Sequence, residues 1–192
     1  TNFEGKEELR QRLINEAPKF GNDDDYVDLI MRDVHHRTHE EVAKFADYYG
    51  YPYTLNGSNA ASYAPYGRVC NALPDGKKAK ESFADAPHSP MAGRDKKGPT
   101  AVLKSMGKYT PEWGNLTNQR FMPQFLEGEN RKLFAAYLKT RAELGSAHIQ
   151  FNVVDNKTLL DAQEHPEKYF NLIVRVAGYS AYFIDLPKGI QD

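Results

Sequence analysis

A run near the C-terminus, residues 175–183 (RVAGYSAYF), has residue types and a spacing suited to chemistry at a backbone atom. It places one glycine, Gly178, between two apolar, strand-like segments, residues 172–177 and 182–186. Glycine has no Cβ, so its backbone reaches conformations that other residues avoid and lets another group approach closely. On its own, a glycine in a strand pattern indicates a bulge or a tight turn.

Two other clusters have residue types that bind metals. His35 and His39, and likewise His36 and Glu40, have a helical i, i+4 spacing. The arginines interleaved with them favour a charged, solvent-facing helix surface instead. The acidic residues 23–25 favour a helix N-cap over a calcium loop, because no spaced carboxylate series ending in Glu follows. We therefore predict no metal site.

The run 175–183 closely resembles the signature loop of the glycyl radical enzymes, the pyruvate formate-lyase-like superfamily. Other blocks resemble the same family, in order and at similar intervals. They are FEG with LR (3–10), PKFGNDD (18–24), ALPDG (72–76), SP, Asp95 and GPTA (89–101), QFNVV (150–154), and LLDAQ with HPE (159–167). Several ordered blocks are more specific than one motif, so the chain is identified as a member of this family.

The resemblance implies that Gly178 is catalytic and stores an unpaired electron. An α-carbon radical is stabilised when the amide nitrogen donates into it and the carbonyl withdraws from it, and both effects require a flattened backbone without a side chain. The family uses a separate activating enzyme, with S-adenosylmethionine and a 4Fe–4S cluster, to remove the hydrogen; no cofactor is bound by the chain itself. The radical loop is expected to be buried in the complete enzyme, where oxygen and water are excluded.

The single cysteine, Cys70, lacks the family's reactive-cysteine motif and lies in a turn-rich connection. The resemblance therefore implies that the working cysteine lies outside this sequence, on the remainder of the barrel. The expected fold is α/β, with residues 1–95 as the last elements of the ten-stranded catalytic barrel and residues 96–192 as the glycyl radical domain, truncated at its C-terminus. The resemblance also implies a homodimer of the full enzyme.

The sequence around the glycine resembles the branch of dehydratases, choline lyase, arylacetate decarboxylases and fumarate-adding synthases. This favours an anaerobic lyase that cleaves a C–O, C–N or C–C bond of a small molecule. The first alternative is an enzyme that adds a hydrocarbon to fumarate. The second alternative is a standalone radical subunit or a non-catalytic binding module.

Several residues are candidates for supporting the loop. Arg175, Tyr179 and Ser180 flank the glycine and would hold the loop or dock the activating enzyme, although ordinary strand-surface pairing explains them as well. Gln150 and Asn152 alternate with apolar residues and so share one strand face. They would hydrogen-bond the loop backbone, or lie on a solvated face.

We predict that Leu55 and Asn56 line the substrate pocket. Their segment resembles the family strand that lines this pocket, because it lies at a similar distance in sequence from the glycine. A plain barrel strand and its turn is the alternative interpretation.

The composition sets limits on the class of protein. The 192 residues are 40% hydrophobic and 27% charged, with a formal net charge of −1. No basic field indicates nucleic-acid binding, and no apolar run is long enough for a membrane helix. The first residues show no signal peptide, and one cysteine excludes an internal disulfide framework; both favour the cytoplasm.

The elements that would position Gly178 follow from periodicity and from breakers. We expect helices at 1–16, 25–49 (ending at Gly50), 98–109, 128–144 and 158–164, strands at 51–58 and 148–154, a loop at 63–95 and a turn at 114–118.

Overall fold

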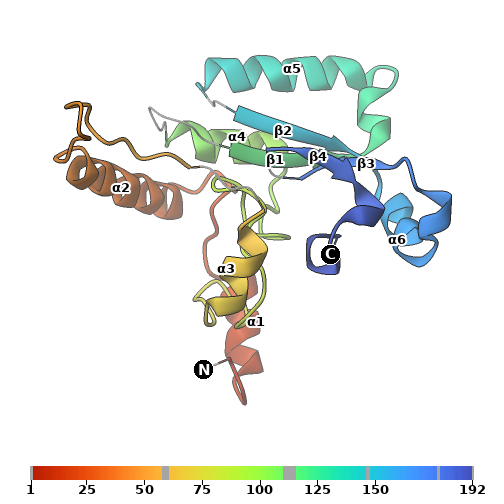
Figure 1. Cartoon of the computed structure of the whole chain (residues 1–192), viewed down its shortest axis with the longest axis horizontal. Coiled ribbons are helices and arrows are strands. Elements are labelled where there is room, and N and C mark those ends of the chain that lie inside the picture. The colour runs from red at the N-terminus through yellow and green to blue at the C-terminus, as the bar shows by residue number, and fades with distance from the viewer. Residues whose placement is uncertain (1, 58–60, 110–115, 146–147, 177, 192) are drawn as a thin grey trace.

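Two parallel strands lie at the centre of the C-terminal half of the chain (Figure 1). The computed structural model describes residues 2–57, 61–109, 116–145, 148–176 and 178–191. Strand β1 (Leu116–Phe121) pairs in register with β2 (His148–Val153), so that Asn118 lies opposite Gln150. Parallel strands require a crossover connection, which is supplied by the 3-10 turn η1 (Pro123–Leu126) and helix α5 (Asn130–Glu143).

One face of this sheet carries the hydrophobic core. Alternate side chains of β1 point to it, and Phe121 packs its ring 5.4 Å from that of Tyr137 on α5 and 5.8 Å from that of Phe151 on β2. Leu103 of helix α4 (Pro99–Gly107) completes the buried cluster. The period-two alternation of a strand leaves the other residues of β1 and β2 for the opposite face.

The opposite face is covered by a short antiparallel hairpin, β3 (Ile173–Arg175) and β4 (Ser180–Tyr182). This hairpin is a two-stranded sheet of its own. Helix α6 (Asn156–Glu164) and the turn η2 (Pro166–Lys168) lead from β2 to β3, and the turn η3 (Phe183–Asp185) and helix α7 (Lys188–Gln191) follow β4.

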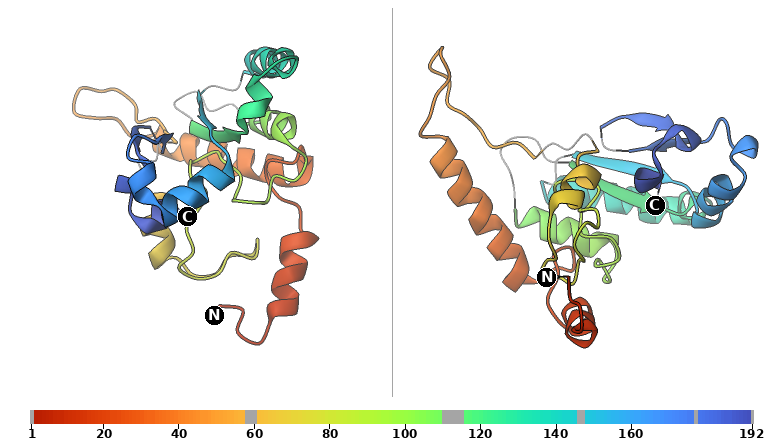
Figure 2. Two further views of the ribbon diagram at one scale, coloured as in Figure 1. Left: turned by 90° about the vertical axis from the view of Figure 1, so that its right-hand side faces the viewer. Right: turned by 60° about the horizontal axis from the view of Figure 1, so that its bottom comes forward.

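The N-terminal elements project away from the sheet in two directions (Figures 1 and 2). They are α1 (Glu7–Asn15), α2 (Asp25–Val42) and α3 (Tyr63–Val69), joined by long irregular segments. As expected for the acidic run, Asp24 caps α2 by accepting a hydrogen bond from the Tyr26 amide.

An ion cluster fastens α2 to the end of α4. The Lys108 ammonium lies 2.8 Å from Asp23, 2.7 Å from Asp25 and 3.0 Å from Asp28, which is fully buried. Burial alone would lower the pKa of Lys108, but the hydrogen bonds with these carboxylates outweigh it and raise that pKa above its ordinary value. Lys108 is therefore held in its protonated, charged form by the carboxylates that surround it.

The mixed α/β content agrees with the predicted fold class, and most of the predicted elements are confirmed. The helices predicted at 98–109, 128–144 and 158–164 and the strand at 148–154 are present with slightly shorter or shifted bounds. Among the described residues, no helix combines the length and the apolar character needed to cross a bilayer.

The predicted end of the second helix was wrong. Helix α2 ends at Val42, and the chain beyond it forms a turn at residues 47–51, in which the Asp47 carboxylate accepts the amides of Tyr49 and Tyr51. Gly50 lies within this turn, at φ +87°, and does not cap the helix.

Five other predictions need correction. The helix expected at 1–16 begins only at Glu7, because Phe3 and Gly5 adopt positive φ; residue 1 lies outside the described residues. Residues 51–57 form no strand beyond an isolated bridge at Pro52, since a strand needs a neighbour to pair with. The expected loop at 63–95 contains α3, and the expected turn at 114–118 overlaps β1, which its pairing with β2 stabilises. The expected apolar strand at 182–186 begins earlier, at Ser180, and continues as η3.

Candidate functional site

The glycine lies at the turn of the β3–β4 hairpin. Gly178 has φ +88°, a left-handed conformation that side chains disfavour. A Cβ built at this position would meet nothing within 4 Å, and the residue is exposed in this chain. The backbone conformation, and not crowding, therefore requires a glycine here, and the α-carbon is accessible to another molecule. Ala177, next to it, lies outside the described residues.

Gln150 is the contact between the sheet and the glycine. Its side-chain Oε1 accepts the Gly178 amide at 3.2 Å and the Arg175 Nε–H at 3.0 Å. The side chain of Gln150 is buried, with 5% of its surface exposed. It reaches the hairpin because β2 turns Phe151 to the core and its neighbours to the opposite face.

Two asparagines hold the base of the hairpin. Asn152 makes a reciprocal pair with the backbone of Arg175, accepting its amide at 2.7 Å and donating to its carbonyl at 2.5 Å. Asn118 donates to the Val176 carbonyl at 2.9 Å. Together with Gln150 they form an amide triad, which we define as Asn118, Gln150 and Asn152. The alternative interpretation, in which Gln150 and Asn152 lie on a solvated strand face, is therefore wrong: both side chains bond the hairpin.

Asn118 was missed by the sequence analysis. The segment around it was assigned to a turn, so its side chain had no expected direction. The signal that would have found it is the alternation in residues 116–121, which places Asn118 on the same face as its parallel partner Gln150.

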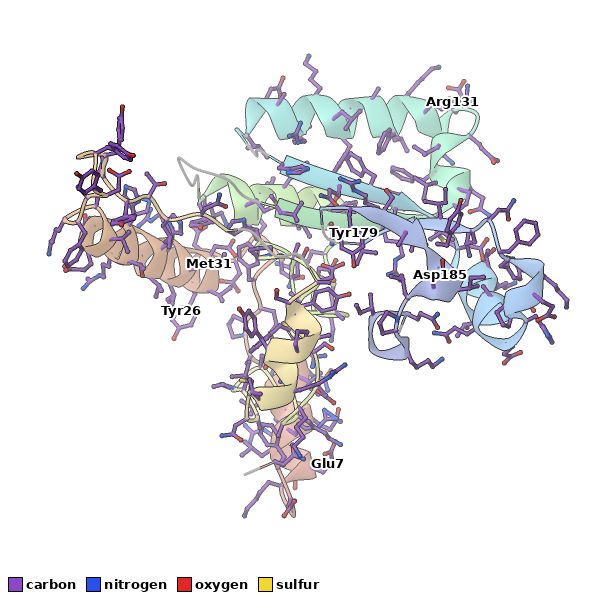
Figure 3. The ribbon with its side chains drawn as sticks, in the orientation of Figure 1. Glu7, Tyr26, Met31, Arg131, Tyr179 and Asp185 are labelled. Atoms are coloured by element: carbon purple, nitrogen blue, oxygen red, sulfur yellow. The ribbon has the colours of Figure 1, made fainter. Side chains whose placement is uncertain are left out.

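Arg175 closes the loop from within the hairpin. Its Nη2 donates to the Gly178 carbonyl at 3.3 Å and its Nη1 donates to Ser180 Oγ at 3.3 Å. With the bond to Gln150, all three guanidinium nitrogens face the loop. Tyr179 is 39% exposed, and Figure 3 shows it on the hairpin, in front of β1 in that view.

The remaining predicted residues lie apart from this arrangement. A cavity of about 450 Å³ at the base of the hairpin is lined by Asn152 and Arg175 among others, but neither Leu55 nor Asn56 lines it. Cys70 ends α3, where its amide and carbonyl both form backbone hydrogen bonds. In the described part of the chain, no group of three or more His, Cys, Asp or Glu side chains is arranged to hold a metal ion.

The comparison with known families bears directly on the hairpin. A family model described as "Glycine radical" matches residues 85–184, which is more than half of the chain and includes the whole hairpin. The chain belongs to the glycyl radical enzyme family. A second family model, "Pyruvate formate lyase-like", matches residues 1–67.

Curated members of the glycyl radical family are similar over the full chain. Isethionate sulfite-lyase of Nitratidesulfovibrio vulgaris is 40% identical over 100% of the chain, and trans-4-hydroxy-L-proline dehydratase of Clostridioides difficile is 38% identical over 100%. The chain spans only 24% of the length of each of these relatives.

Solved glycyl radical enzymes have the same fold over this region. The glycerol-bound B12-independent glycerol dehydratase from Clostridium butyricum superposes with a TM-score of 0.92 at 40% identity, covering 99% of this chain and 24% of that one. Hydroxyproline dehydratase from Clostridioides difficile gives 0.93 at 37% identity, with coverage of 99% and 24%. The chain thus shares its fold with about a quarter of the length of these solved enzymes.

Proposed function

We propose that Gly178 is the residue that stores the unpaired electron. The observation that carries this proposal is the hairpin itself: an open glycine α-carbon, flanked by backbone groups that are each hydrogen-bonded, within the segment matched by the glycine radical family. A separate activating enzyme, which uses S-adenosylmethionine and a 4Fe–4S cluster, removes one hydrogen atom from the α-carbon.

The stored radical then acts on a cysteine outside this chain. One hydrogen atom passes from the cysteine thiol to the Gly178 α-carbon and leaves a thiyl radical, which attacks a small-molecule substrate; the transfer reverses at the end of turnover. We propose cleavage of a C–O, C–N or C–C bond; the relatives named as dehydratases support C–O cleavage, the one named as a decarboxylase supports C–C cleavage, and the one named as a sulfite-lyase adds C–S cleavage as a further candidate. The proposed reaction class is therefore that of a lyase.

We propose that the remainder of the barrel shelters the hairpin. Gly178, Tyr179 and Ser180 are exposed in this chain, which is a poor environment for a radical that oxygen destroys. The relatives are about four times longer, so most of their fold has no counterpart here. In this proposal residues 1–95 belong to the barrel and residues 96–192 form the radical domain, in a cytoplasmic homodimer of the complete enzyme.

The neighbours of Gly178 have supporting roles in this proposal. Arg175, Ser180, Gln150 and Asn152 hold the loop, and every nitrogen of the Arg175 guanidinium is already engaged there, which favours holding over docking of the activating enzyme. A pocket role for Leu55 and Asn56 stays a prediction, to be tested by a change of substrate preference in variants.

Electron paramagnetic resonance after anaerobic activation of the complete enzyme tests the proposal. We expect a doublet from the single remaining α-hydrogen, and its collapse when the protein is made with α-deuterated glycine. The matched control for Gly178→Ala is Gly50→Ala, because Gly50 has φ +87° and equally open surroundings. The signal must disappear only in Gly178→Ala.

Oxygen supplies a second readout. Air admitted to the activated enzyme should cleave the chain at Gly178, giving two fragments that mass spectrometry locates. Persistence of the doublet in Gly178→Ala, or cleavage at another glycine, would show that the radical is elsewhere.

A further inference from the structure

The two peptide groups of Gly178 are polarised in opposite senses. The amide N–H donates to a neutral oxygen, Oε1 of Gln150, at 3.2 Å. The carbonyl oxygen accepts from a cation, Nη2 of Arg175, at 3.3 Å. The peptide group before the α-carbon therefore donates to a neutral acceptor, and the peptide group after it accepts from a charged donor.

These polarities match what an α-carbon radical requires. An acceptor on the N–H raises the electron density on nitrogen and so strengthens its donation into the half-filled orbital. A cationic donor on the carbonyl oxygen stabilises negative charge there and strengthens withdrawal, and hydrogen bonds from charged donors are stronger than neutral ones. The reverse arrangement would weaken both effects.

The charge on Arg175 is free to act on the carbonyl. In the described part of the chain, the guanidinium's hydrogen-bond partners are all neutral oxygens, from Gln150, Ser180 and Gly178. A paired carboxylate would cancel much of the field at the Gly178 carbonyl. A neutral glutamine oxygen instead receives both the Arg175 Nε–H and the glycine amide, which couples the two contacts through one atom.

We propose that Arg175 and Gln150 tune the electronic structure of the Gly178 radical, and do not merely hold the loop. This inference rests on the proposed function of Gly178. It predicts that the two residues lower the energy of the radical relative to the intact C–H bond, by moving spin density from the α-carbon onto the adjacent nitrogen.

The hyperfine couplings of the activated complete enzyme measure this directly. In Arg175→Met and in Gln150→Leu we expect a wider α-hydrogen doublet, a smaller coupling to 15N in labelled protein and faster anaerobic decay of the signal. Arg175→Lys keeps the charge and should recover part of the wild-type couplings.

The matched control is Asn152→Ala. Asn152 clamps the backbone of Arg175 but bonds neither group of Gly178, so its loss loosens the hairpin without removing either polarising contact. We expect wild-type couplings in Asn152→Ala, even if the amount of radical falls. A purely structural role for Arg175 would give Arg175→Met and Asn152→Ala the same couplings.

A second measurement does not depend on activation. In the 192-residue chain labelled with 13C at glycine carbonyls, the Gly178 resonance is assigned by its absence in Gly178→Ala. Arg175→Met should shift it to lower frequency, and Asn152→Ala should leave it nearly in place. No shift in Arg175→Met would overturn the inference even where that variant forms no radical.

The outcomes separate the two proposals. If the wild-type enzyme gives no glycine-centred doublet, the proposed function fails. If the wild type gives the doublet but Arg175→Met and Gln150→Leu retain its couplings, the function of Gly178 stands and the tuning inference alone is refuted.

Discussion

Replacement of Gly178 by alanine should cost little folding stability in this chain. The position has φ +88°, and a left-handed conformation costs a non-glycine residue about 1–2 kcal/mol. The added Cβ meets nothing within 4 Å, so no packing cost adds to the backbone cost. In a chain of this size, that loss lowers the melting temperature by about 2–8 °C.

Two other glycines with the same backbone conformation calibrate this number. Gly50, at φ +87°, is also surrounded by open space, so Gly50→Ala should cost the same. Gly21, at φ +93°, differs: its Cβ would lie 2.4 Å from the Cγ of Pro90. Overpacking adds about 1–3 kcal/mol, so Gly21→Ala should be the least stable of the three.

Thermal unfolding of the 192-residue chain ranks these variants, and the complete enzyme extends the test. If Gly178→Ala destabilises the chain as much as Gly21→Ala, the surroundings of Gly178 are crowded and the reasoning from open space is refuted. If the remainder of the barrel covers the hairpin, the cost of Gly178→Ala should be larger in the complete enzyme than in the 192-residue chain.

Other contacts give further predictions, all measured by urea unfolding. Lys108→Met removes the cation that pairs with Asp25 and with the fully buried Asp28, whereas Asp23 keeps Lys104, and should cost about 3 kcal/mol. Lys104→Met breaks only the exposed pair with Asp23 and should cost less than about 1 kcal/mol; equal losses in the two variants would contradict the role of burial. Burial lowers the pKa of His88 to about 4, so only the unfolded chain takes up this proton between pH about 6.5 and 4. Stability should fall by about 3 kcal/mol as the pH falls through that range, and His88→Gln should flatten the profile. Tyr137→Phe removes the hydrogen bond to the buried Gln119 and should cost about 1–3 kcal/mol; an unchanged midpoint would mean that another partner satisfies the amide.

The sequence predicted the glycine hairpin and part of its support because local patterns encode them. Gly178 between two apolar segments indicates a turn, and the alternation around Phe151 assigns Gln150 and Asn152 to one face without knowledge of the fold. The strongly periodic helix α5 was predicted for the same reason.

The rest depends on contacts between distant parts of the chain. Asn118 belongs to the site only because β1 pairs with β2, more than twenty residues away, and the turn residues around it favoured a different local structure. The bonds from Arg175 could not be predicted, since they require the folded hairpin to turn the guanidinium back over the loop. The expected strand at 51–58 failed for the converse reason, because its apolar residues find no strand partner among the described residues.

The attachment of the hairpin to the sheet has a mechanical consequence. The β3–β4 ladder is separate from the β1–β2 ladder, and side-chain amides connect the two sheets. The hairpin can therefore separate from the β1–β2 sheet without the loss of any hydrogen bond within either ladder, and β3 and β4 would move together. Arg175 would travel with Gly178, whereas Gln150 would remain on the sheet, so the carbonyl would keep its cation while the amide lost its acceptor.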